Sequence, residues 1–395
     1  MKRTLMLKNQ ELLDFEVDTL AEEIRILDAP AADDPLLASL GLGGPDRDVI
    51  VANAILSRHI SAARDDFALI LDAFGARSRF ELSFMGHGLS LIDKLWYRAP
   101  GATERWEDIN FLDNDWDSAF CTSVLTRDYK NLASCSPDIP DFTTKGHLRK
   151  AWERAEDGIQ LLKEPMFENG YDLTGAQLGA ELCSLLFGQD AYQPLNVVER
   201  YGKRFAASPL MVGGDEELVQ GWRLFAMGGF DASESARLMG HTSPQSCIDV
   251  IARAGVADAS AHVAKTSALR ALSFLAAIHT GNYGIICNLE TGARHGAPPF
   301  DYDRSFGFPF KGAPFEALCN NPKFAALMCV RDYTDLDSLW DWSWYDPHAL
   351  EGFEGRIVEA YAGFTDLPAN FGELIAGLFK MQRDYVTETA SERRG

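Results

Sequence analysis

The spacing of hydrophobic residues in the first half of the chain favours short strands. Apolar and polar residues alternate in Thr4–Lys8 and in Leu12–Val17, on either side of Asn9–Gln10, and this pattern predicts a β-hairpin. A second hairpin is predicted around Asp157–Gly158, where the strand after the turn ends at Lys163. Leu195–Arg200 and Arg204–Val212 predict two further strands. These segments together predict a small sheet that is complete by about residue 213.

One helix is predicted inside this strand-rich region. Leu178, Leu182, Leu185 and Leu186 recur at the helical period, and Gly188 is a stop signal for a helix. Thr174 and Gln177 have the spacing of a capping box, so we expect the helix to begin near Thr174.

Beyond residue 216 the helical period dominates. One hairpin is expected to interrupt it, with a strand over Tyr283–Cys287, a turn at Glu290–Gly292 and a second strand that ends at Asp301. The expected helices are Glu216–Phe225, Ser233–Leu238, Pro244–Ala254, Ala257–Ala277, Phe315–Leu327, Asp335–Trp342, Pro347–Tyr361 and Ala369–Thr387. The fold class is therefore expected to be α+β, in three parts: an α+β leader domain over 1–140, a small β-rich lobe over 141–213 and a large α-helical lobe over 214–395.

Composition and charge restrict the classes of partner. Apolar residues make up 46% of the 395 residues, which suits a globular chain with a sizeable core. The formal net charge of −21 repels nucleic acid and anionic lipid, so we expect neither direct nucleic-acid binding nor a membrane surface as a partner. The seven cysteines include no C-x-x-C pair, and no signal peptide or long apolar run is evident. We therefore expect a cytoplasmic protein with reduced thiols.

Polar side chains gather at the ends of the predicted second hairpin. His279 and Asn282 lie on the loop that enters it, and Asp301 lies on the loop that leaves it. Because two paired strands bring these loops together, we expect Asn282 and Asp301 to be neighbours. Their oxygens suit magnesium, and Asp303, two residues further on, could add a carboxylate.

The residues of this hairpin resemble the catalytic and metal-binding loops of the HipA-like kinases. The family pattern D-x-H-x-x-N-F-G is matched by His279, Asn282, Tyr283 and Gly284, and the family's F-D metal loop is matched by Phe300–Asp301. At the position of the family's catalytic aspartate this chain has Ala277. The recognisable motifs cover about residues 143–307, and Gly88–Asp113 is similar to the leader region of some family members.

This resemblance implies a bilobal protein kinase-like fold that binds Mg-ATP and transfers phosphate to serine or threonine. It assigns Asn282 and Asp301 to the metal and gives His279 a supporting role through hydrogen bonds. It also implies a toxin–antitoxin context, with a protein substrate such as a translation factor or a regulatory protein partner.

Phosphate groups need a close backbone and a cation. Gly146 is the candidate for the glycine-containing loop, and Lys163 is the candidate cation at a strand end. Glu181 lies among apolar helix residues, so we expect it to pair with Lys163 and to hold that lysine on the phosphates. Each residue also has a simpler interpretation: a structural turn for Gly146, a solvated cation for Lys163 and an exposed helical acid for Glu181.

Three functions remain open at this point. The first is a weakened but active serine/threonine kinase, and the second is a pseudokinase that acts as a nucleotide-binding regulatory or interaction module. The third is a structural partner-binding protein with an empty cleft. Ala277 separates the first two, because general-base catalysis is typically worth about 10² to 10⁴ in rate while nucleotide and metal binding depend on other residues.

Overall fold

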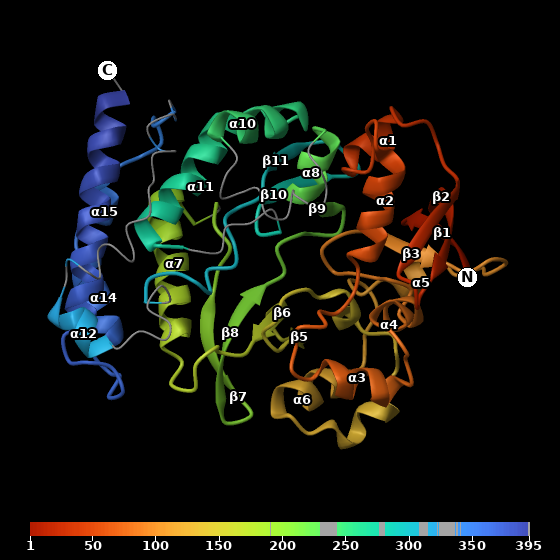
Figure 1. The fold of residues 1–395 in the computed structure, drawn as a ribbon, viewed down its shortest axis with the longest axis horizontal. Coiled ribbons are helices and arrows are strands. Elements are labelled where there is room, and N and C mark those ends of the chain that lie inside the picture. Colours follow the sequence, from red (N-terminus) through yellow and green to blue (C-terminus); the bar gives the residue numbers. More distant parts are fainter. Residues whose placement is uncertain are drawn as a thin grey trace.

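The computed structural model describes residues 1–189, 191–229, 243–275, 281–307, 315–321, 323, 336, 339 and 341–393. Within these residues the strands form three antiparallel sheets, with helices packed around them (Figure 1). The mixed α+β class predicted from the sequence is confirmed. The N-terminal sheet and the last helix, α15 (Phe371–Arg393), lie at opposite ends of the molecule.

The N-terminal sheet has the strand order β3-β2-β1-β4. The predicted first hairpin is confirmed as β1 (Lys2–Leu7) and β2 (Gln10–Asp18), which are joined by β3 (Glu23–Asp28) and β4 (Leu95–Arg98). Alternate residues of β1 and β2, such as Leu5 and Phe15, are buried in one core with α1 (Pro35–Ser39) and α2 (Arg47–Leu56).

The second sheet has the order β5-β6-β8-β7. Its strands are β5 (Lys150–Ala155), β6 (Gly158–Lys163), β7 (Asn196–Arg200) and β8 (Lys203–Pro209), and the predicted turn at Asp157–Gly158 is confirmed. Helix α7 (Tyr171–Phe187) contacts this sheet and ends at Gly188, whose φ of 87° suits glycine. The predicted capping box is wrong, because the helix begins after Gly170 and Thr174 is buried inside it.

The segment from 60 to 142 packs directly on the second sheet. It contains α3 (Phe67–Phe74), α4 (Arg79–Met85), α5 (Trp106–Ile109), α6 (Ala119–Thr126) and the 3₁₀ helices η1 (Tyr129–Ser134) and η2 (Pro140–Thr143). One hydrophobic cluster includes Phe120 and Phe142 from this segment and Leu162 and Phe205 from the sheet. The core therefore runs across residue 140, and the division of the chain at that residue stays a prediction.

The third sheet corrects the predicted helix over Glu216–Phe225. Residues 216–220 form strand β9 (Glu216–Gln220), and helix α8 (Gly221–Met227) starts only after it. β9 pairs with β10 (Gly284–Asn288), which also pairs with β11 (Arg294–Gly296). The predicted second hairpin is therefore confirmed, but its second strand ends at Gly296 and not at Asp301 as predicted. The pairing of Val219 with Ile285 buries both side chains, and this distant contact overrides the local helical pattern. A Cβ on Gly284 would lie 2.4 Å from the carbonyl oxygen of Val219, so this close approach requires glycine.

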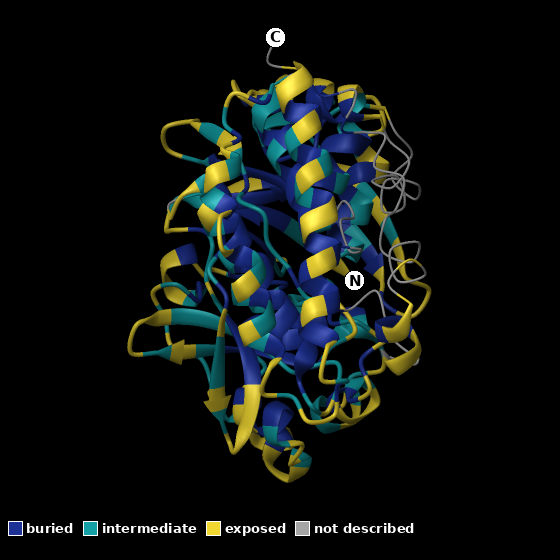
Figure 2. Cartoon of the chain, turned by 90° about the vertical axis from the view of Figure 1, so that its left-hand side faces the viewer, coloured by how far each residue is buried: buried dark blue, intermediate teal, exposed yellow. Residues whose placement is uncertain are grey.

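Helices cover the remaining side of the molecule. They are α10 (Pro244–Arg253), α11 (Ala259–Ser273), α12 (Phe315–Asn320), the 3₁₀ helix η6 (Pro347–Leu350), α14 (Phe353–Tyr361) and α15. Helix α15 buries the side turned to the molecule and exposes the other (Figure 2). The predicted helix Ser233–Leu238 and half of Asp335–Trp342 lie outside the described residues. In the described part of the chain, no helix combines the length and the apolar character needed to cross a membrane.

Candidate functional site

A cavity of about 310 Å³ opens where all three sheets approach one another. Its walls come from the end of α2, the segment 90–95 before β4, the loop 143–146, the β5–β6–β8 sheet, the β9–α8 junction and the loops that flank the hairpin β10–β11. The N-terminal region therefore forms part of the wall, although its sequence suggested no chemistry.

One end of the cavity holds a group of side chains that we name the transfer cluster: Lys163, Asn282, Asp301 and Asp303. Lys163, at the end of β6, places Nζ 2.6 Å from Oδ1 of Asp301 and 2.8 Å from Oδ2 of Asp303. Asn282 donates from Nδ2 to Oδ2 of Asp301 at 2.8 Å. The hairpin thus brings Asn282 and Asp301 together as expected, and Asp301 keeps a left-handed φ of 63°, a strained conformation for a residue with a side chain.

The two carboxylates of this cluster titrate in opposite directions. Burial opposes the charge of Asp301, but Lys163 and Lys150 outweigh it and hold the pKa of Asp301 well below its ordinary value. Burial and the neighbouring charge of Asp301 raise the pKa of Asp303 to about 6, against the opposite effect of Lys163. Burial also disfavours the Lys163 ammonium, yet the two carboxylates raise its pKa. Lys163 is therefore charged and held by two acids.

The loop that contains Gly146 closes over a second lysine. Gly146 has a φ of 95°, and a Cβ there would lie 2.6 Å from Nζ of Lys150. Lys150 is 8% exposed and donates to the carbonyl oxygen of Lys145 at 2.7 Å. Burial and the charge of Lys163 lower the pKa of Lys150 to about 8. The backbone of the Gly146 loop and two ammonium groups thus face the same end of the cavity.

Sequence reasoning missed Lys150, although a signal was present. In the hairpin β5–β6, Ala155 pairs with Gly158, and the same register places Lys150 opposite Lys163. The predicted turn therefore already implied two lysines side by side on paired strands.

The predicted ion pair between Lys163 and Glu181 is wrong. Both carboxylate oxygens of Glu181 accept from Nε of Arg356 on α14, each at 3.1 Å. Glu181 is not among the residues that line the cavity, so its predicted cofactor-binding role has no support from this arrangement. Helix α7 turns this residue toward α14, and Asp301 and Asp303 neutralise Lys163 instead. His279 and Ala277 lie outside the described residues.

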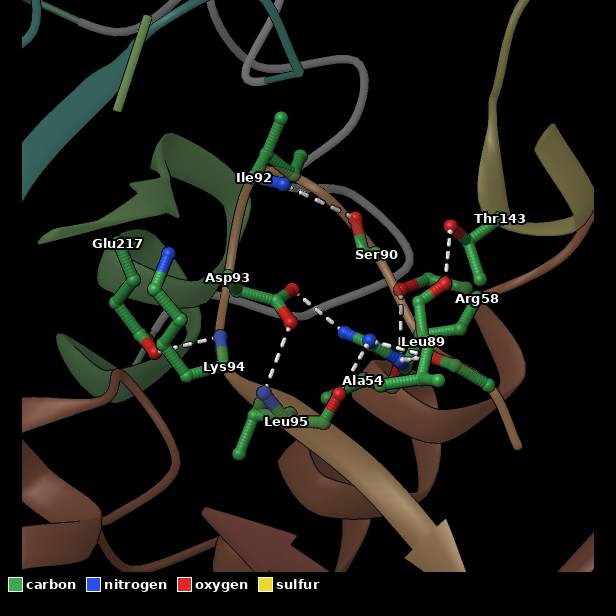
Figure 3. Close-up of polar contacts among 12 residues, drawn as sticks. Ala54, Arg58, Leu89, Ser90, Ile92, Asp93, Lys94, Leu95, Thr143 and Glu217 are labelled. Atoms are coloured by element: carbon green, nitrogen blue, oxygen red, sulfur yellow. Dashed lines mark hydrogen bonds and ion pairs between the residues drawn. The ribbon is translucent and has the colours of Figure 1, made fainter. Parts of the chain in front are cut away.

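A second charged group, which we name the leader cluster, consists of Arg58, Asp93, Lys94 and Glu217 (Figure 3). Arg58 and Asp93 line the cavity. Arg58 donates to Oδ2 of Asp93 at 2.5 Å, and its other nitrogens donate to the carbonyl oxygens of Gly88 and Leu95. Asp93 also accepts from the backbone nitrogen of Leu95 at 3.1 Å. The Arg58–Asp93 pair lines the cavity and is fixed largely by main-chain groups.

The other two members of the leader cluster lie behind this pair. Lys94 and Glu217 are fully buried, and their contact is a long one of 3.5 Å from the Lys94 backbone nitrogen to Oε2 of Glu217. In the described part of the chain, Nζ of Lys94 and Oε1 of Glu217 have no hydrogen-bond partner. Burial and the charge of Asp93 raise the pKa of Glu217 to about 7, although Arg223 acts in the opposite direction.

Comparisons with known proteins add information on the fold. No family model matches the sequence, and no curated protein matches it. The structure is similar to that of the Helicobacter pylori proinflammatory kinase CtkA, with 13% identity, a TM-score of 0.47 and coverage of 62% of this chain and 93% of that chain. It is also similar to the Shewanella oneidensis MR-1 toxin–antitoxin complex of HipA, HipB and operator DNA, with 10% identity, a TM-score of 0.54 and coverage of 99% of both chains. Because the latter similarity extends over the whole chain, it shows that the chain has a fold similar to that of the Shewanella HipA structure.

Proposed function

We propose that this chain binds Mg-ATP in the cavity as a HipA-like serine/threonine protein kinase whose phosphotransfer is weak or lost. The observation that carries this proposal is the transfer cluster, in which Lys163 contacts both Asp301 and Asp303 while Asn282 contacts Asp301. A lysine, an amide and two carboxylates at the edge of a cavity are the groups that phosphoryl transfer requires.

The residues present fit a magnesium ion. Asp301 and Asn282 would hold it, and Asp303 is close enough to Lys163 and Asp301 to take part. Carboxylate and amide oxygens are the hard ligands that magnesium takes. When bound, the metal would neutralise negative charge on the phosphates. Lys163 contacts both carboxylates in this structure. Binding of magnesium would replace the ammonium group of Lys163 with the metal ion beside Asp301 and Asp303.

The remaining walls suit a nucleotide. Lys150, Lys163 and the backbone around Gly146 would bind the phosphates, because two cations and a close main chain face that end. Side chains beside them, including Trp152, Leu161 and Phe300, would give the base an apolar surface. This combination of a mostly apolar wall and a few convergent polar groups is typical of small-molecule sites.

The reduced activity in this proposal rests on Ala277. The resemblance places this residue where a carboxylate would orient the attacking hydroxyl and accept its proton, and alanine can do neither. The alternative function is a pseudokinase that acts as a nucleotide-binding regulatory or protein-interaction module. The same cavity supports both, and turnover separates them. A purely structural role is less favoured. Removing the Lys150 and Lys163 ammonium groups from water beside a cavity is unfavourable, and a structural protein has no need of it.

A protein acceptor or regulatory protein in the cytoplasm remains the proposed partner. The similar Shewanella structure contains HipB and operator DNA. With a net charge of −21, this chain would approach DNA only through such a partner.

Isothermal titration calorimetry with ATP tests the proposal. We expect binding in the presence of magnesium, and a large loss of affinity after chelation of the metal or in the variant Asp301→Asn. The variant Asp249→Asn is the matched control, since Asp249 is an exposed residue of α10 outside the cavity. Lack of magnesium-dependent binding in the wild type would refute both kinase-derived functions. A turnover assay on the same sample then distinguishes a weak kinase from a pseudokinase.

A further inference from the structure

The cavity is also lined by residues to which the proposed nucleotide site gives no role. A nucleotide held by Lys150, Lys163 and the apolar wall leaves the end next to the leader cluster without a role. That end is formed by Arg58 and Asp93, by Lys145 of the Gly146 loop, and by Trp222 and Arg223 of α8. Because Lys145 directly precedes Gly146, this end adjoins the region proposed for the phosphates.

Positive charge exceeds negative charge at this end. Arg58 is balanced by Asp93 at 2.5 Å. Arg223 is 4% exposed and donates to the carbonyl oxygens of Leu40 and Leu218, which carry no net charge. Lys145 places Nζ 5.4 Å from the ring centre of Trp222 and is exposed. Asp93 is therefore the acid that faces Arg58, Lys145 and Arg223 at this end, so cations outnumber acids there within a chain whose net charge is −21.

The position and the charge of this end favour an acceptor rather than a second nucleotide. An acceptor hydroxyl must lie beside the transferred phosphate, and this end is the part of the cavity that adjoins the Gly146 loop from the side of the N-terminal region. The ring of Trp222 gives a flat surface for a peptide segment, while Lys145 and Arg223 favour a carboxylate on that segment.

We propose that the end of the cavity next to the leader cluster binds the phosphate acceptor, and that it selects a serine- or threonine-bearing peptide segment with acidic side chains beside the hydroxyl. This inference rests on the proposed function, because it names the substrate class of the same site. It assigns the N-terminal region a role in specificity.

Peptide binding tests this inference without turnover. Two labelled peptides of equal length are compared, one with glutamate on both sides of a central serine and one with glutamine at the same positions. Fluorescence anisotropy is measured on the full chain, with magnesium and a non-hydrolysable ATP analogue present at saturation. We expect the glutamate peptide to bind about tenfold tighter, although the overall negative charge of the chain opposes it.

Two charge-reversal variants separate local recognition from overall charge. Lys145→Glu should abolish or invert the preference between the peptides. Lys203→Glu changes the net charge by the same amount, and Lys203 is exposed at the start of β8 and outside the cavity, so the preference should persist. Because both lysines are exposed, both variants are expected to fold, and circular dichroism checks this.

The outcomes distinguish this inference from the proposed function. Equal affinities for the two peptides, no binding of either, or the same change in both variants would overturn the acidic-acceptor site while leaving nucleotide binding intact. If the ATP analogue does not bind, the proposed function fails, and the assignment of this end to a phosphate acceptor fails with it.

Discussion

The transfer cluster and the leader cluster are both charged groups at the edge of one cavity, but they are held in different ways. In the leader cluster, Arg58 spreads its donors over two carbonyl oxygens and Asp93, and Asp93 accepts from the main chain in turn. In the transfer cluster, the contacts of Lys163 with Asp301 and Asp303 join side chains only. A planar guanidinium matches several fixed acceptors, whereas an ammonium is a compact charge whose partners can be exchanged.

This difference indicates that the leader cluster stabilises the fold, whereas the transfer cluster can bind a ligand. Main-chain contacts fix the position of Arg58 and leave little to rearrange. Lys163 and the two aspartates can separate without breaking a main-chain hydrogen bond, so a bound cation and phosphate can replace their contacts. The leader cluster should therefore respond to mutation mainly in stability, and the transfer cluster mainly in binding and transfer.

The largest effect should come from breaking the leader cluster. Asp93→Ala leaves the buried Arg58 without its acid, and loss of one partner of a buried pair typically costs about 3–5 kcal/mol. Urea unfolding at pH 7 measures the free energy of unfolding. Asp115→Ala is the control, since the Asp115 side chain is 94% exposed, and it should change stability by less than about 0.5 kcal/mol. A similar small loss in Asp93→Ala would show that the pair does not brace the fold.

The second effect concerns transfer. Ala277→Asp restores a carboxylate where the resemblance expects one, so phosphotransfer to a protein or peptide should rise roughly 10²-fold or more. Adding Asp301→Ala should abolish the gain, because the proposed metal ligand is lost. A radiolabelled phosphate assay at saturating Mg-ATP measures both. A wild-type chain that already transfers phosphate as fast as Ala277→Asp would place the base elsewhere.

The third effect is a pH dependence within the leader cluster. Burial and Asp93 raise the pKa of Glu217 to about 7, above its unfolded value near 4.5, so folding favours the protonated acid. This contribution to stability is present at low pH and is lost as pH rises through about 7. Glu217→Gln removes the ionisation, and the fall in stability from pH 5 to pH 8.5 should become smaller by on the order of 1 kcal/mol. Parallel urea titrations of the two proteins measure it, and identical pH profiles would contradict the assignment.

The smallest effect should come from Glu181→Gln. Its pair with Arg356 is more than a third exposed on both sides, and such pairs contribute about 0–1 kcal/mol. Nucleotide affinity should not change, because the pair lies outside the cavity wall. A calorimetric titration that showed a tenfold loss of affinity would restore the phosphate-anchoring role that the sequence suggested for Glu181.

The parts of the fold that were predicted correctly depend on local signals. Alternation and turn residues identified the hairpins β1–β2 and β5–β6, and the closure of the hairpin β10–β11 brought Asn282 to Asp301. The register of β5–β6 also places Lys150 opposite Lys163, and it follows from the same turn. These features need only residues that are near one another in sequence.

The features that were missed depend on distant contacts. The five residues of β9 became a strand because β10 offers a partner more than 60 positions later. Glu181 took Arg356 as its partner because α7 packs against α14, and these two residues are 175 positions apart in the sequence. The cavity wall formed by Arg58 and Asp93 required the packing of α2 against α8 and the contact of residues 92–94 with β9, and no local pattern records that arrangement.

The residues that line the cavity are far apart in the sequence, so the site can form only late in the synthesis of the chain. The lining residues extend from Ala54 to Asp303, and the contacts that close the cavity join positions as far apart as Leu40 and Arg223 or Lys163 and Asp301. A nascent chain that has not yet released Asp303 from the ribosome therefore has no complete site. Once the whole chain has folded, a ligand in the cavity touches its early and late segments together, so it stabilises the molecule as one cooperative unit by an amount that grows with ligand concentration.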